Sequence, residues 1–78
     1  GAHWSYNLAT PASSVTLEIK DSQGRVVQTL SGDLAAGEHT LAWDGIDSRG
    51  QKAPEGVYTL VPTAKTASGA DVAVATYG

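Results

Sequence analysis

Three acidic side chains lie close together in one polar stretch, DGIDSRGQKAPEG, residues 44–56. Asp44, Asp47 and Glu55 carry oxygen atoms of the kind that Ca²⁺ prefers, and this cation takes about 6 to 8 of them. The spacing is not that of a calcium loop, which places acidic or amide side chains at every second position and a glycine sixth. Arg49 also lies within the stretch and competes for the charge of the two aspartates. We therefore predict no metal site here.

The same acids and glycines have the composition of tight turns. An Asp side chain in a turn accepts a hydrogen bond from the backbone two residues on, and Gly supplies positive φ angles that other residues avoid. We predict this role for Asp44 and Asp47, with Gly45 and Gly50 at the positive φ positions. The stretch is therefore interpreted as a joint of the fold.

Catalysis by a nucleophile requires an activating base beside it. The chain has no cysteine and no serine in a glycine-flanked elbow between a strand and a helix. Of its two histidines, His3 lies near the frayed start and His39 alternates with apolar neighbours. We predict that His39 is partly buried, with its ring packed and one nitrogen bonded. The sequence predicts no enzyme, no catalytic residue and no cofactor.

Composition limits the remaining function classes. The 78 residues carry 5 Lys and Arg against 8 Asp and Glu, a formal net charge of -3, and the basic residues are scattered. Nucleic acid is therefore not an expected partner, and no apolar run approaches the roughly 20 residues that a membrane helix needs. We expect one domain over residues 1–78, in a fragment of a longer protein, with residues 1–2 left over from cloning.

Apolar and polar residues alternate with a period of two almost everywhere, which is typical of half-buried β-strands. The predicted strands cover residues 3–9, 14–20, 25–30, 38–43, 57–64 and 70–77. The turns between them predict an all-β fold, an antiparallel immunoglobulin-like (fibronectin type III-like) β-sandwich of six to seven strands. Pro62 is expected at an edge or bulge, and the inward residue of Val26 and Val27 stays open, with a bulge as one solution.

The aromatic residues have two interpretations, a sugar-stacking platform or part of the core. Trp4, Tyr6, Trp43 and Tyr58 are each in phase with aliphatic residues of their own strand, which favours the core. Tyr58 follows Gly56 where a loop enters a strand, the position of a tyrosine corner. Leu34 is expected to tuck under the sheet.

Several segments together carry a resemblance to a known family. They are YNLATPASSVTLEIKDSQGRVVQTL, AAGEHTLAWDGIDSRG and PEGVYTLVPTA, which cover nearly the whole chain. In order and spacing they resemble the immunoglobulin-like (fibronectin type III-like) domain of the bacterial flagellar hook-capping proteins, the FlgD family. Pro62 departs from this pattern, because the family usually keeps a β-branched residue there.

The resemblance implies a structural and assembly module of the flagellar hook cap, which scaffolds the polymerisation of hook subunits. Such proteins are exported by the flagellar secretion apparatus and lie outside the cell at the tip of the growing hook. The implied partners are hook subunits and other copies of the cap protein; we expect the isolated fragment to be a monomer, and no interface residue is assigned. The alternative is a ligand-binding or adhesive sandwich, for example a carbohydrate-binding one, at the end of a larger secreted bacterial protein.

The residues singled out for a structural role are those around the acidic stretch. Trp43 is predicted to fill the core and Tyr58 to fix the start of the next strand. The site prediction consists of Trp43, Asp44, Gly45, Gly56 and Tyr58.

Overall fold

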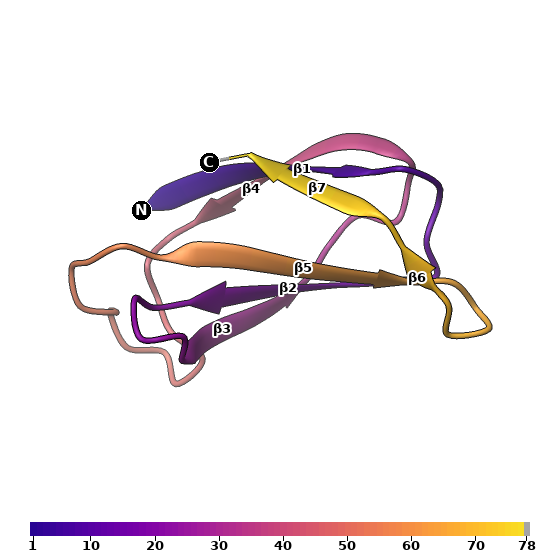
Figure 1. Cartoon of the computed structure of the whole chain (residues 1–78). Coiled ribbons are helices and arrows are strands. Elements are labelled where there is room, and N and C mark those ends of the chain that lie inside the picture. The colour runs from indigo at the N-terminus through magenta and orange to yellow at the C-terminus, as the bar shows by residue number, and fades with distance from the viewer. Residues whose placement is uncertain (78) are drawn as a thin grey trace.

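The computed structural model describes residues 1–77. Within these residues the chain forms seven strands and no helix, as the period-two alternation predicts. The strands are β1 (Ala2–Leu8), β2 (Ser14–Lys20), β3 (Val26–Ser31), β4 (Gly37–Trp43), β5 (Thr59–Lys65), β6 (Asp71–Val72) and β7 (Val74–Tyr77). They form a three-stranded sheet, β4-β1-β7, and a four-stranded sheet, β3-β2-β5-β6, and every pairing is antiparallel. The two sheets lie one above the other (Figure 1), so the predicted sandwich is confirmed.

The core consists of the inward-facing residues of both sheets. From Trp4 onwards every second residue of β1 is buried, and so is every second residue of β2, as the alternation predicted. The buried residues are Trp4, Tyr6, Leu8, Val15, Leu17, Ile19, Trp43, Leu60, Ala64 and Val72. Removing such apolar side chains from water, at about 25 cal/mol per Å², is the main force that holds the two sheets together.

A β-bulge settles which valine of β3 faces inward. Ile19 pairs with Gln28 and Lys20 pairs with Val26, so Val27 is the extra residue on β3. Val27 packs against the core, whereas Val26 is 46% exposed. The bulge that the sequence left open is confirmed, and it explains why two consecutive valines break the alternation.

Within the described residues, Pro62 lies in the part of β5 that has a neighbouring strand on one side only. It pairs with Leu17 of β2, while β6 on the opposite side pairs only with Ala64 and Lys65 in the described part of the chain. A proline cannot donate a backbone hydrogen bond, so this position suits it. The expected edge location is confirmed.

The last predicted strand is in fact two. β6 belongs to the four-stranded sheet and β7 to the three-stranded sheet, with Ala73 between them. The carbonyl of Ala73 accepts the amide of Ala9 at 3.0 Å, which fixes the point where the chain changes sheets. The prediction of one strand over residues 70–77 was wrong, because periodicity does not report which sheet a residue joins.

Three smaller predictions need correction. Leu34 does not tuck under the sheet, since it is 44% exposed. Two residues before it, Tyr6, Val15 and Leu17 fill the space beneath Gly32. His3 is not at a frayed end, since it lies within β1 and pairs with Ala42.

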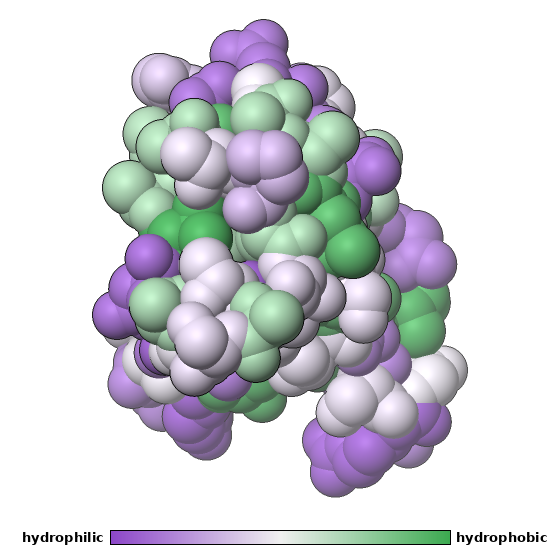
Figure 2. Space-filling view, turned by 90° about the vertical axis from the view of Figure 1, so that its right-hand side faces the viewer, coloured by the Kyte–Doolittle hydropathy of each residue, from purple (hydrophilic) through white to green (hydrophobic). Residues whose placement is uncertain are grey.

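The third correction concerns the start of β5, which begins at Thr59 and not at Val57. Val57 is 75% exposed and belongs to the loop before the strand. The exposed large apolar residues are Val26, Leu34, Val57 and Tyr77. Figure 2 shows small apolar patches separated by polar side chains over one end of the molecule. No helix within residues 1–77 is long and apolar enough to cross a membrane.

Candidate functional site

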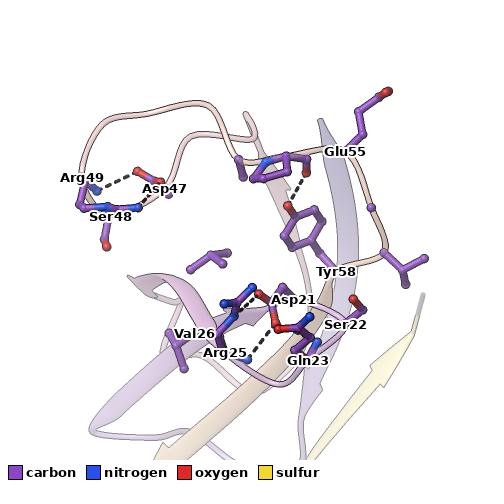
Figure 3. A pocket seen from close by; sticks show the side chains of 15 residues that line it. Asp21, Ser22, Gln23, Arg25, Val26, Asp47, Ser48, Arg49, Glu55 and Tyr58 are labelled. Atoms are coloured by element: carbon purple, nitrogen blue, oxygen red, sulfur yellow. Dashed lines mark hydrogen bonds and ion pairs between the residues drawn. The ribbon is translucent and has the colours of Figure 1, made fainter.

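A hollow of about 470 Å³ lies at one end of the sandwich, between the β2–β3 hairpin and the loop that joins β4 to β5. The hairpin contributes residues 21–27 to its lining, with the exception of Gly24, and the loop contributes residues 47–49 and 53–58. Figure 3 shows the two turns facing each other across it, with Tyr58 on the side of the β4–β5 loop. Asp47 and Glu55, two of the three acids of residues 44–56, line this hollow.

The hairpin turn is closed by the Asp21 carboxylate. Asp21 Oδ1 accepts the backbone amides of Gln23 and Arg25, each at 2.9 Å, and Oδ2 accepts Nε of Arg25 at 2.9 Å. The turn is completed by two backbone bonds, from Asp21 to the carbonyl of Arg25 and from Gly24 to the carbonyl of Asp21. Gly24 has φ = 82°, the left-handed conformation that glycine adopts most readily.

The turn at residues 47–51 repeats this arrangement. Asp47 Oδ1 accepts the amides of Arg49 and Gln51, each at 2.9 Å, while the Asp47 amide donates to the carbonyl of Gln51 at 2.7 Å. Gly50 has φ = 81°. Arg49 Nη2 lies 3.8 Å from Asp47 Oδ2. The predicted bond to the amide two residues on is present, and the second bond, four residues on, was not predicted.

A third turn, at residues 66–70, has the same backbone bonds with a threonine in place of the aspartate. The Thr66 amide donates to the carbonyl of Ala70 at 2.8 Å, and the Thr66 carbonyl accepts the amide of Gly69 at 2.9 Å. Thr66 Oγ1 accepts the Ala70 amide at 3.2 Å. The likeness of the two aspartate turns is visible in the sequence, since DSQG at residues 21–24 and DSRG at residues 47–50 differ at one position. Sequence reasoning treated the two separately and missed it.

These bonds lower the pKa of both turn aspartates. The pKa of Asp21 lies below its ordinary value chiefly because the carboxylate accepts the amide of Arg25. The pKa of Asp47 is lowered chiefly by the amide of Gln51. Partial burial opposes both shifts without reversing them. The charge of each carboxylate is therefore balanced by donors of its own turn.

Asp44 and Gly45 form a different bend just after β4. Asp44 Oδ1 accepts the amide of Ile46 at 2.9 Å, two residues on, as predicted, and Gly45 has φ = 83°. The bend is held further along the loop, because the carbonyl of Gly45 accepts the amide of Ala53 at 2.8 Å and Ile46 forms an isolated bridge with Lys52.

Trp43 connects this bend to the core. Its side chain is 6% exposed, and its indole Nε1 donates to the carbonyl of Ile46 at 2.9 Å. The ring meets Tyr58 edge-on at a centroid distance of 5.0 Å and stacks on Trp4 at 6.5 Å. Removing Trp43 would thus loosen both the core and the loop that follows it.

Tyr58 is half-buried and its hydroxyl donates to the carbonyl of Pro54, four residues upstream. This is the backbone contact expected of a tyrosine corner. Gly56 has no positive φ, and a Cβ added to it would meet no atom within 4 Å. Nothing in the structure explains why residue 56 is a glycine.

A second tyrosine contact, which the sequence did not indicate, lies at the β3–β4 crossover. Tyr6 is 2% exposed and its hydroxyl accepts the amide of Asp33 at 2.9 Å. The Tyr6 ring lies 5.3 Å from that of His39, whose Nε2 is 2.7 Å from the carbonyl of Ala35. His39 is partly buried and packed as predicted, and its Nδ1 also lies 3.6 Å from the Asp33 carboxylate.

Gly32 allows this crossover to pass close over the core. A Cβ at residue 32 would lie 2.7 Å from the Tyr6 hydroxyl, 2.8 Å from Cγ1 of Val15 and 3.0 Å from Cδ1 of Leu17. No residue other than glycine fits there without displacing the core. Sequence reasoning missed this glycine because its contacts are distant in the chain.

The three acids of residues 44–56 do not converge on a common point. Asp44 and Asp47 are turned towards amides of their own turns, and Glu55 points outward in Figure 3. No group of three or more His, Cys, Asp or Glu within residues 1–77 could hold a metal ion. The arrangement stabilises loops.

The sequence is similar to proteins of one family. Residues 2–68 match the family model described as the FlgD Ig-like domain. Over 58 residues the chain is 48% identical to the basal-body rod modification protein FlgD of Salmonella typhimurium strain LT2, and 41% identical to that of Escherichia coli K12. Each alignment covers 73% of this chain and 25% of the relative. The chain therefore spans about a quarter of the length of the curated relatives it matches.

Proposed function

Because the chain belongs to the FlgD Ig-like domain family, we propose that it is a structural and assembly module of the bacterial flagellar hook cap. In this role the domain helps to scaffold the polymerisation of hook subunits. The observation that carries the proposal is the family match over residues 2–68, together with relatives named basal-body rod modification protein FlgD.

The chemistry of the loop end supports a structural role. Asp21 and Asp47 each bond two amides of their own turn, and Tyr58 bonds the backbone of the loop that precedes it. Side chains engaged in this way hold loops in shape and are not directed at a substrate. We therefore assign the domain no catalytic activity and interpret Trp43, Asp44, Gly45 and Tyr58 as residues of a structural joint.

The partners in this proposal are hook subunits and other copies of the longer protein, outside the cell at the tip of the growing hook. Export by the flagellar secretion apparatus is part of the same proposal. The adhesive alternative receives no support from Trp4, Tyr6 and Trp43, because all three are buried and Trp4 stacks on Trp43 within the core.

At micromolar concentration the 78-residue chain is proposed to be a monomer. Most of its large apolar residues lie in one core. Of the four exposed ones, Val26, Leu34, Val57 and Tyr77, only Val26 and Val57 line a common hollow. A stable interface needs about 1,200 Å² of buried surface or more. Sedimentation equilibrium at micromolar concentration should give the mass of one chain, and a dimer would contradict the proposal.

A domain exchange tests the assembly role. The 58-residue region of the Salmonella typhimurium relative that aligns with this chain is replaced by the corresponding region of this chain. The hybrid should restore swimming in soft agar to a strain that lacks the relative. An unrelated immunoglobulin-like sandwich of similar length, inserted at the same place, should not. Equal motility from both hybrids would show that the region is only a spacer, and a stable, exported hybrid without motility would contradict the proposal.

A further inference from the structure

The longest regular open edge of the sandwich is that of β4. All seven residues, Gly37–Trp43, pair with β1 without a register shift, and β4 is the terminal strand of its sheet. Within residues 1–77, no backbone bond to a neighbour on the outer side of β4 is present. Natural proteins usually protect such an edge with charged side chains, above all lysine, with proline or with a bulge. β4 has no lysine, proline or bulge, and its one acidic side chain is Glu38.

The other edges are short or covered. β6 has two residues and β7 has four. β3 is as long as a typical strand, but the β4–β5 loop lies along it, because the amide of Ser48 donates to the carbonyl of Val27 at 2.9 Å. Gln28 Nε2 also donates to the carbonyl of Ile46, at 3.3 Å. Of the edges described, β4 thus stands out as a regular strand left open.

We propose that the edge of β4 is a strand-addition surface for a second copy of this chain. The two β4 strands pair antiparallel about a two-fold axis, which joins two three-stranded sheets into one of six strands. Full overlap of two seven-residue strands places the axis at the central residue, Thr40. This inference goes beyond the assembly role proposed above and can be tested without it.

The register centred on Thr40 is chemically self-complementary on the outer face. Thr40 lies opposite Thr40 of the second copy, and Glu38 lies opposite Ala42. Glu38, Thr40 and Ala42 are all exposed in the single chain. Thr–Thr pairs across antiparallel strands are favourable, and like charges directly opposite each other are not. No like charges meet in this register, because Glu38 is the one acid of β4.

The inner face is equally compatible. His39 lies opposite Leu41, and Gly37 lies opposite Trp43. His39 and Leu41 are only partly buried in the single chain, so pairing would cover them further. The small Gly37 leaves room beside the large indole of Trp43. Both faces therefore accept the same register, which is what an isologous contact requires.

The contact is expected to be weak in solution. One strand edge covers less surface than a stable interface needs, so dissociation in the millimolar range is expected, which agrees with a monomer at micromolar concentration. Copies held close together within an assembly would pair far more readily, because the effective concentration there reaches the millimolar range.

Single cysteines test the register, since the chain has no cysteine of its own. Thr40→Cys places two thiols opposite each other at the axis. With Glu38→Cys or Ala42→Cys alone, the two thiols are about 13 Å apart along the strand at 3.3 Å per residue, too far for a disulfide. In a mixture of Glu38→Cys and Ala42→Cys, a dimer of one chain of each kind places the two thiols directly opposite each other.

On oxidation at about 1 mM, Thr40→Cys should form dimers about tenfold faster than Glu38→Cys or Ala42→Cys alone. The mixture should give mainly the mixed dimer. Thr29→Cys, an exposed threonine of the covered edge strand β3, is the matched control and should be slow. Equal rates at all positions, or a faster Glu38→Cys dimer, would overturn the proposal.

A measurement without cross-linking follows amide chemical shifts by NMR. Between about 0.05 and 2 mM, concentration-dependent shifts should be confined to β4 and its neighbours. Thr40→Lys sets two like charges opposite each other and should abolish these shifts, whereas Thr29→Lys should retain them. Shifts elsewhere, or shifts that persist in Thr40→Lys, would contradict a contact through β4.

Discussion

Two loops of this domain are fixed by a tyrosine hydroxyl, and they use it in opposite ways. Tyr58 donates to the carbonyl of Pro54, four residues upstream in the same loop. Tyr6 accepts the amide of Asp33, 27 residues further along the chain. The first contact ties a loop to the strand it enters, and the second ties one sheet to the crossover between the sheets.

The two contacts also differ in their surroundings. Tyr6 is 2% exposed and packed against His39 and Gly32, whereas Tyr58 is half-buried beside an open hollow. A hydrogen-bonding group that loses its partner in a buried place costs more than one that water can reach. The crossover is therefore expected to tolerate less change than the hollow, apart from Trp43, which belongs to the core.

The largest expected effect is that of Trp43→Ala. The substitution removes an indole that contacts Tyr58 and Trp4 and donates to Ile46, and it leaves a cavity in a small core. We expect the free energy of unfolding to fall by about 3 to 5 kcal/mol. Urea denaturation would measure the loss, and a variant within about 1 kcal/mol of the parent would show that Trp43 is not part of the core.

At the crossover, Gly32→Ala should cost about 1 to 3 kcal/mol through overpacking. The added methyl group would lie within 3.0 Å of side-chain atoms of Tyr6, Val15 and Leu17. Gly56→Ala, near Tyr58, is the matched control, because a Cβ there meets no atom within 4 Å. Comparing the urea midpoints of the two variants sharpens the contrast between the regions. A larger loss from Gly56→Ala would reverse it.

The two tyrosines can be compared directly by removing only the hydroxyl group. Tyr6→Phe leaves the partly buried amide of Asp33 without its acceptor and should cost about 1 to 2 kcal/mol. Tyr58→Phe leaves a carbonyl that water can reach and should cost about 0.5 to 1 kcal/mol. Urea denaturation of both variants decides the order. If Tyr58→Phe is the more damaging, the local contact is the main one.

What the sequence could predict was mostly local. The turns at Asp44 and Asp47 were foreseen because an Asp side chain bonds amides a few residues away. The strands were foreseen because alternation is visible in any short window. Tyr6, Gly32 and the change of sheet at Ala73 depend on contacts between residues far apart in the chain. No short pattern encodes such contacts.

Lowering the pH should reduce the stability that the carboxylates of Asp21 and Asp47 contribute through their turns. A carboxyl group with a lowered pKa in the folded state contributes stability above its ordinary pKa of 3.8, and this contribution is lost as the pH falls through the lowered value. Stability should therefore decline as the pH falls below about 4. The double variant Asp21→Asn, Asp47→Asn keeps an acceptor oxygen in each turn but cannot titrate, so its urea midpoint should vary less between pH 4.5 and pH 2. An unchanged pH dependence would contradict the proposed role of these carboxylates.

The central claim is that the acids of the loop end hold turns and do not bind a cation. The most direct test is the melting temperature of the chain in millimolar CaCl₂ and in EDTA, at equal ionic strength. We predict the same melting temperature in both. A calcium site at 100 times its dissociation constant would stabilise the fold by about 2.7 kcal/mol and raise the melting temperature by about 10 °C or more for a domain of this size. A rise of that order in calcium, abolished by Asp47→Asn, would show that the loop is a metal site.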